Sequence, residues 1–131
     1  MADPREELVG VWMQAARDDL GSAVKLIEGD SIYPGTSLYH CQQCAEKALK
    51  AFLLSIGVAF EKTHNLSVLV ELCSDKDSAF QQLKDLAERL TPYATLYRYP
   101  EEVETPTIDE AREAIIMARA VLDVVAAVLS H

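Results

Sequence analysis

Two groups of polar residues in the middle of this 131-residue chain have the types and spacing of a phosphate or nucleotide site. Gln43, Lys47 and Lys50 recur at steps of three and four, which places them on one face of a predicted helix. Lys62 and His64 stand directly before the next predicted helix, whose first backbone amides can bind an anion. Two cations at that end oppose the helix dipole, so a bound anion would explain their presence. The structural alternatives are a solvated helix face for the first group and simple helix capping around the second.

A third group lies in residues 91–106, a segment with three prolines and three tyrosines and without helical or strand periodicity. Here Arg98 stands between Tyr97 and Tyr99, and an arginine between aromatic rings can hold a phosphate while the rings stack on a base. The rings can equally pin the loop to the rest of the domain. Long loops in compact domains tend to be functional or disordered, so both interpretations stay open.

The predicted helix over residues 36–56 carries the first group and is apolar over most of its circumference. Its polar side chains fall within about 120° of the helical wheel, and the other 200° or so is apolar, as expected for the central helix of a bundle. The exception is Gln42, whose amide falls among apolar side chains and needs partners across a helix interface or in a pocket. Within the polar stripe, Glu46 and Lys50 stand four residues apart in the order that favours an ion pair.

Cys41 and Cys44 have the spacing of a zinc or redox motif, but their context favours small core residues. A structural zinc site needs four ligands, and the chain adds only Cys73 and scattered histidines. Redox pairs stand at helix N-termini, whereas these two lie inside a predicted helix on its apolar arc. We therefore predict no metal and no cofactor. The chain also lacks a Ser-His-Asp order and a glycine-rich phosphate loop, so no catalytic residue is predicted.

Five helical segments account for most of the chain and predict an all-α fold. Asp3, Pro4 and Glu6 form a helix-start signal, and Thr107 with Glu110 forms a capping box. The expected helices cover residues 4–29, 36–56, 65–73, 78–90 and 107–130. They predict one domain over residues 1–131, an up-and-down bundle of four to five helices with the long Tyr/Pro-rich loop before the last one.

Composition restricts the function further. Twelve Lys and Arg against 21 Asp and Glu give a net charge of −9, which opposes general binding to nucleic acid because such affinity rests on cations that displace counterions from phosphates. A nucleic-acid contact must therefore be local. The first residues lack a basic region followed by an apolar one, so we expect a cytoplasmic protein. The most apolar stretch, residues 114–129, is interrupted by Arg119 and Asp123, so no membrane contact is expected.

The last predicted helix is apolar around about 260° of its circumference. A four-helix bundle can bury one face of such a helix, and the remaining Val, Ile, Leu and Met side chains would form a large exposed patch. Self-association would cover that patch. The sequence therefore predicts a homodimer formed through the last helix.

Three stretches of the chain together resemble the HEPN domain family, named for a nucleotide-binding domain of higher eukaryotes and prokaryotes. They are residues 39–54, which read Tyr-His-Cys-Gln-Gln-Cys-Ala-Glu-Lys-Ala-Leu-Lys-Ala-Phe-Leu-Leu, residues 62–66, Lys-Thr-His-Asn-Leu, and residues 97–100, Tyr-Arg-Tyr-Pro. The resemblance covers nearly the whole chain. It implies a compact helical bundle that is commonly a homodimer, in agreement with the apolar surplus of the last helix.

The resemblance also implies two kinds of function. Many bacterial members of the family work with a small nucleotidyltransferase as a toxin–antitoxin pair, and many are metal-independent ribonucleases. The ribonucleases carry an arginine followed, after four to six residues, by a histidine. Counting from Arg98, that histidine would fall at Val103, Glu104 or Thr105, so the motif is absent.

Three functions follow from these observations. The first is a non-catalytic nucleotide- or phosphate-binding HEPN protein, dimeric and paired with a nucleotidyltransferase, whose site is the local basic cluster of Lys47, Lys50, Lys62, His64 and Arg98. The second is a divergent ribonuclease that uses His64 and Arg98 on RNA. The third is a protein-interaction module without a ligand.

Overall fold

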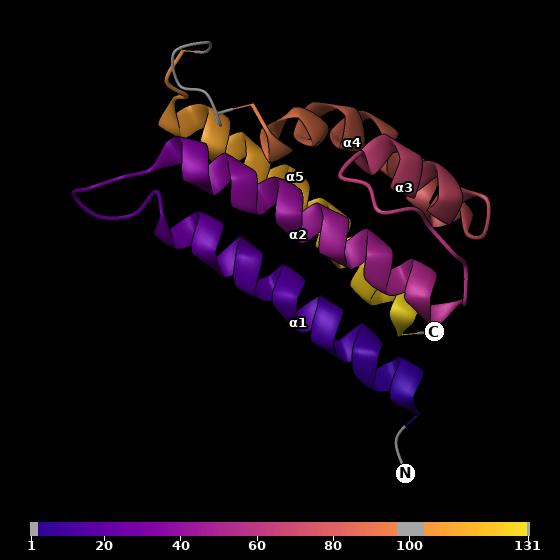
Figure 1. Ribbon diagram of the computed structural model, residues 1–131. Coiled ribbons are helices and arrows are strands. Elements are labelled where there is room, and N and C mark those ends of the chain that lie inside the picture. The colour runs from indigo at the N-terminus through magenta and orange to yellow at the C-terminus, as the bar shows by residue number, and fades with distance from the viewer. Residues whose placement is uncertain (1–2, 97–103, 131) are drawn as a thin grey trace.

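The computed structural model describes residues 3–96 and 104–130, and over these residues the chain is all-α and contains no strand. The described residues form five α-helices, whose arrangement is drawn in Figure 1. They are α1 (Pro4–Lys25), α2 (Pro34–Ser55), α3 (Leu66–Ser74), α4 (Lys84–Leu90) and α5 (Ile108–Leu129), with 3-10 helices at Ser78–Leu83 and Thr91–Ala94. The expected fold class is confirmed.

The helices begin where local capping chemistry places their starts. The Asp3 carboxylate accepts a hydrogen bond from the Arg5 amide at 2.9 Å, and Pro4 occupies the first position of α1. The Thr107 hydroxyl accepts from the Glu110 amide at 3.1 Å and starts α5. After α2 the chain turns at Gly57, whose φ of 69° favours glycine.

Successive elements of the bundle alternate in direction along the chain. Figure 1 shows α1 running opposite to α2, and α5 running in the same direction as α2. After α2, the segment from α3 to α4 runs back toward the end of the bundle at which α5 begins. The up-and-down arrangement is therefore confirmed. Two boundaries differ from the prediction: α1 ends at Lys25 rather than near Gly29, and the expected helix over residues 78–90 begins as a 3-10 helix.

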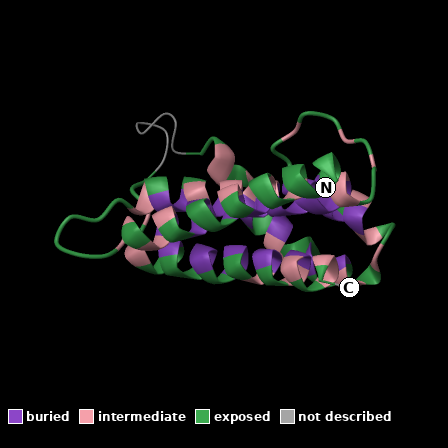
Figure 2. Ribbon diagram, turned by 90° about the horizontal axis from the view of Figure 1, so that it is seen from below, coloured by how far each residue is buried: buried purple, intermediate pink, exposed green. Residues whose placement is uncertain are grey.

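Helix α2 is the centre of the bundle, as its wide apolar arc predicts. It packs against α1, α3 and α5, and 13 of its 22 residues are buried. Figure 2 shows buried residues along the inner faces of the long helices. Cys41, Cys44 and Cys73 lie in this core with no exposed area, and burial raises the pKa of each thiol to about 12. They are core residues, as expected.

The apolar surplus of α5 is largely covered within the single chain. Contacts with α2 and α1 bury eight of its residues, including Ile115, Val121 and Leu122. Ile116, which is 69% exposed, is the large apolar side chain of the described part of α5 that stays open to water. The patch that predicts a dimer is therefore smaller than the helical wheel suggests, and the homodimer stays a prediction. None of the described helices is long and apolar enough to cross a membrane.

Candidate functional site

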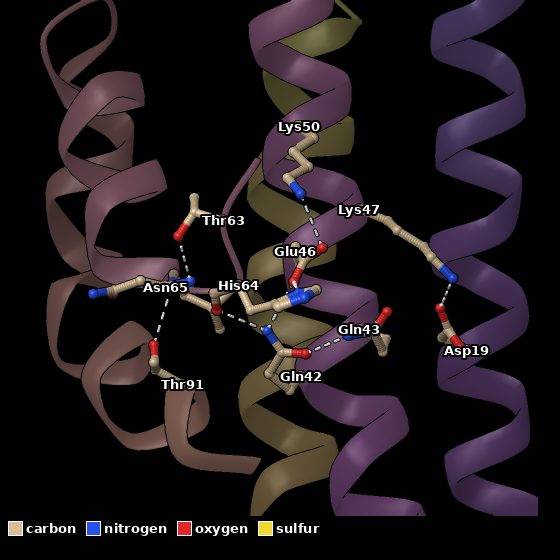
Figure 3. Close-up of polar contacts among 11 residues, drawn as sticks. Asp19, Gln42, Gln43, Glu46, Lys47, Lys50, Thr63, His64, Asn65 and Thr91 are labelled. Carbon is tan, nitrogen blue, oxygen red and sulfur yellow. Dashed lines mark hydrogen bonds and ion pairs between the residues drawn. The ribbon is translucent and has the colours of Figure 1, made fainter. Parts of the chain in front are cut away.

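Polar side chains of α2 take part in two clusters, each built on a buried carboxylate that pairs with one lysine and one histidine. Figure 3 shows both carboxylates, Asp19 on α1 and Glu46 on α2, with their lysines. We call Asp19, His40 and Lys47 the Asp19 cluster, which joins α1 to α2. We call Glu46, Lys50, His64 and Gln42 the Glu46 cluster, which joins α2 to the segment before α3. Both clusters link the central helix to a neighbouring element through charge-assisted hydrogen bonds.

In the Glu46 cluster, every oxygen of the Glu46 carboxylate has a partner. Its Oε2 accepts from Lys50 Nζ at 3.0 Å, and its Oε1 lies 2.8 Å from His64 Nδ1 and accepts from Gln42 Nε2 at 3.1 Å. The side chains of Glu46 and Lys50 are both only 7% exposed. The Lys50 ammonium also lies 5.8 Å from the centre of the Phe60 ring.

The protonation of Glu46 follows from these contacts. Burial opposes the charged form of its carboxyl group and would raise its pKa, but the hydrogen bonds from His64, Lys50 and Gln42 and the charge of Lys50 outweigh burial. The pKa of Glu46 is therefore below its ordinary value, and the group is an anion at neutral pH.

The ionised Glu46 fixes the tautomer of His64. A carboxylate has no proton to donate, so His64 Nδ1 must donate to it and carries the ring proton. In the neutral ring, Nε2 then holds a free lone pair. Because the His64 side chain is 67% exposed, this lone pair is accessible to a ligand. The pair has the arrangement of a base or nucleophile with an orienting carboxylate.

Gln42 fixes the backbone beside that ring. Its Nε2 also donates to the main-chain oxygen of His64 at 3.0 Å, and its Oε1 accepts from Gln43 Nε2 at 2.7 Å. Gln42 has no exposed area, and its amide bonds across the interface between α2 and the segment before α3, one of the two roles that the sequence left open. His64 is thus held by its ring and by its carbonyl group.

The Asp19 cluster also joins a carboxylate to a lysine and a histidine, but in a different setting. Asp19 lies on the buried side of α1 and bonds His40 Nδ1 and Lys47 Nζ, each at 2.7 Å. The His40 side chain is 28% exposed, and its ring meets the edge of Tyr39 with centroids 5.6 Å apart. Lys47 is 31% exposed and lies along the gap between the two helices in Figure 3.

The first amides of α3 already have protein acceptors. The Asn65 amide donates to Thr63 Oγ1 at 3.0 Å, the Leu66 amide to Thr91 Oγ1 at 3.1 Å and the Ser67 amide to Asn65 Oδ1 at 3.0 Å. Figure 3 draws the contacts of Thr63 and Thr91 beside Asn65. Three donors that an anion would use are therefore occupied, and the expected anion site at this helix start is not available in this form.

Four of the predicted site residues lie in or beside the two clusters, and one of them, Lys50, has a role other than the predicted one. Gln43, Lys47, Lys50 and His64 all belong to or adjoin the two clusters. A solvated face is the wrong interpretation for Lys50, because it is buried against Glu46. The Lys50 ammonium is paired with the Glu46 carboxylate, so Lys50 is not a free cation for a ligand.

The other predicted residues fall outside the two clusters. Lys62 is exposed and forms no hydrogen bond or ion pair within the described parts of the chain. The aromatic and basic group in the long loop, Tyr97, Arg98 and Tyr99, lies outside the described residues, so the expected clamp on a phosphate stays a prediction.

Sequence reasoning missed Asp19. A signal for it exists, because Asp19 interrupts the buried stripe of α1 formed by Ala16, Leu20 and Ala23. A carboxylate at a buried position needs a cation or a hydrogen-bond donor on a neighbouring element. The pattern cannot say which helix provides that partner.

Comparison with known proteins agrees with this architecture. The model of the HEPN domain matches residues 9–128. A Methanocaldococcus jannaschii protein named "Putative toxin MJ1304" is 33% identical over an alignment that covers 88% of this chain and 84% of the relative.

A solved structure gives the same result at the level of the fold. The crystal structure of ST0689, an archaeal HEPN homologue, superimposes with a TM-score of 0.73 and 28% sequence identity, covering 91% of this chain and 95% of the other. The sequence resemblance, the helical architecture and these matches agree: the chain belongs to the HEPN domain family.

Proposed function

We propose that this protein is a toxin-type HEPN protein that binds the phosphate group of a nucleotide or RNA beside the Glu46 cluster. The observation that carries the proposal is His64, an exposed imidazole whose ring and carbonyl group are both held in place by buried side chains. Lys62, two residues upstream, is exposed and has no ion pair among the described residues, and Lys47 on α2 is partly exposed although it pairs with Asp19. We infer that Lys62 and His64 form a local phosphate site on a chain whose net charge is −9.

The placement of charge explains why such a site would favour one or two phosphate groups over a long nucleic-acid backbone. Asp19 and Glu46 match Lys47 and Lys50, so the two clusters have no excess positive charge before a histidine is protonated. A long phosphate backbone would find few free cations on this face. One or two phosphates contacting Lys62 and His64 suit it better.

Titration of the protein with ATP, GTP and a short RNA tests the binding site directly. We expect Lys62→Ala and His64→Ala each to weaken binding by roughly tenfold to a hundredfold, because hydrogen bonds to charged groups contribute about 1.5–3 kcal/mol. Lys76→Ala is the matched control, since this lysine is exposed beyond the other end of α3. Absence of binding to all three ligands at about 1 mM, where even weak complexes form, would contradict the proposal.

The toxin role and the partners form the second part of the proposal. The relative named as a toxin and the family resemblance support a protein that works with a small nucleotidyltransferase and forms a homodimer through α5. Expression of the chain alone should slow bacterial growth, and co-expression with a small partner nucleotidyltransferase should restore growth. Equal growth in all strains would refute this role.

Sedimentation tests the dimer. Ile116 is the exposed apolar side chain on the outer face of α5, so Ile116→Asp should convert a dimer to a monomer without unfolding the bundle. A wild-type protein that sediments as a monomer at all concentrations would remove the dimer from the proposal.

The Glu46–His64 contact favours a second candidate function, a metal-independent ribonuclease. His64 Nε2 can take the proton of an RNA 2′-hydroxyl, and Glu46 can stabilise the charged ring that results. Incubation with RNA in EDTA should then give cleavage that His64→Ala reduces by about 10²–10⁴-fold, the contribution of a general base. His40→Ala is the control. Cleavage that is absent, or that survives His64→Ala, excludes this activity.

A further inference from the structure

The contrast between His64 and His40 points to a modification site. We propose that Nε2 of His64 is a phosphoryl acceptor, which takes a phosphoryl group from a small acyl phosphate, with Glu46 as its positioning residue. The inference does not depend on nucleotide binding, because it concerns the reactivity of the ring itself.

The geometry supplies the nucleophile. His64 Nδ1 is engaged by Glu46 Oε1 at 2.8 Å, which leaves the lone pair on Nε2 and directs that atom away from the carboxylate. The other Glu46 oxygen is held by Lys50 at 3.0 Å, so the carboxylate cannot turn away from the ring. With Gln42 holding the His64 carbonyl at 3.0 Å, the imidazole is presented on a fixed backbone.

The charge of Glu46 stabilises the phosphorylated form of His64. When the lone pair of Nε2 attacks phosphorus, a nitrogen–phosphorus bond forms, the phosphorus–oxygen bond to the acyl group breaks, and the carboxylate product leaves with the electron pair. The proton on Nδ1 stays, so the ring gains a positive charge that the buried anion Glu46 balances. Exposed Lys62, two residues upstream, is within the same segment and can offset the charge of the phosphoryl oxygens.

His40 provides an internal comparison in the same molecule. It also has its Nδ1 on a carboxylate, at 2.7 Å from Asp19, yet its side chain is only 28% exposed and Tyr39 packs against its ring. An incoming donor must reach the ring in line with the bond that breaks. His64, at 67% exposure, allows that approach far better.

Incubation of the whole chain with acetyl phosphate tests the proposal. We expect the mass of one phosphoryl group to be added, with ³¹P NMR and peptide mass spectrometry placing it on Nε2 of His64. Acetylation of lysines gives a different mass and is counted separately. The adduct should be absent in His64→Ala and unchanged in rate in His40→Ala.

Glu46→Gln tests the positioning role. It keeps the size of the side chain and removes its charge, and we expect the rate of phosphorylation to fall about 10- to 100-fold, the effect that losing a carboxylate partner has on functional histidines at metal sites. Circular dichroism checks that the variant is folded, and Lys62→Ala gives a second, surface variant that should slow the reaction without affecting folding. No adduct on wild-type protein, equal labelling of His40, or an unchanged rate in folded Glu46→Gln each overturns the proposal. Because phosphorylation is read by mass and nucleotide binding by titration, the two proposals can fail separately.

Discussion

The Asp19 and Glu46 clusters contain the same kinds of charged group, but they join different elements and differ in the exposure of their histidines. Each places a carboxylate between a lysine and a histidine on α2 or beside it. Asp19 joins two long helices, and both of its partners belong to α2. Glu46 joins a helix to the segment before α3, and its histidine is 67% exposed against 28% for His40.

The two clusters differ in which partner of the carboxylate stays exposed to solvent. In the Asp19 cluster, Lys47 stays partly exposed to water, so its ion pair with Asp19 carries a small desolvation penalty and contributes little to stability. In the Glu46 cluster, the buried charge of Lys50 is fully committed to the carboxylate, and the exposed partner is the titratable ring. Burial of the anion and exposure of the histidine together make His64 available to a ligand.

The largest expected effect comes from breaking the Glu46 cluster. Glu46→Ala leaves Lys50 buried without its anion and should lower the free energy of unfolding by about 3–5 kcal/mol, the cost of removing one partner of a buried pair. Urea denaturation measures the loss. The double change Glu46→Leu with Lys50→Met should recover much of it, because apolar groups of similar size can replace a buried pair. A loss below about 1 kcal/mol in the single variant would show that Lys50 reaches water.

A smaller effect is expected in the Asp19 cluster. Asp19→Ala removes a hydrogen-bond acceptor, but His40 and Lys47 are both about a third exposed and can turn to solvent. We expect a loss of about 1 kcal/mol in the same denaturation experiment. If Asp19→Ala cost as much as Glu46→Ala, the distinction between a closed and an open cluster would not hold.

The smallest effect is a dependence of the stability on pH that comes from Glu46. The pKa of Glu46 is lower in the folded protein than in the unfolded chain, so its contribution to stability is complete above the ordinary value of about 4.5 and is lost as the pH falls through the folded-state pKa. The difference in unfolding free energy between wild type and Glu46→Gln should therefore shrink on acidification. Urea midpoints measured from about pH 7 to about pH 3 check this, and a difference that grows at low pH would contradict it.

The positions of the helices could be predicted because their signals are local. Asp3 and Thr107 start α1 and α5 through bonds to amides two and three residues away. The segment at residues 78–83 was harder, because Phe80 and Leu83 stand three apart, a spacing that fits a 3-10 helix as well as an α-helix. Periodicity does not separate the two.

The site could be predicted only in part because its chemistry depends on contacts distant in the sequence. The spacing of Glu46 and Lys50 predicted their ion pair, but not that the chain around Phe60 and His64 would cover it. A helical wheel tells which side chains share a face and not what the neighbouring element places against them. For that reason Asp19, 28 residues from Lys47, escaped prediction.

The buried cysteines have a practical consequence for following this molecule in solution. All three thiols are enclosed in the core and have a pKa of about 12, so they are protonated and shielded from alkylating reagents while the bundle is folded. One cysteine introduced at Lys76, which is exposed just beyond α3, would therefore be the only thiol to accept a spin label or a fluorophore under native conditions. The rate at which the natural cysteines react would then report how often the core opens, because they react only in molecules whose bundle has opened.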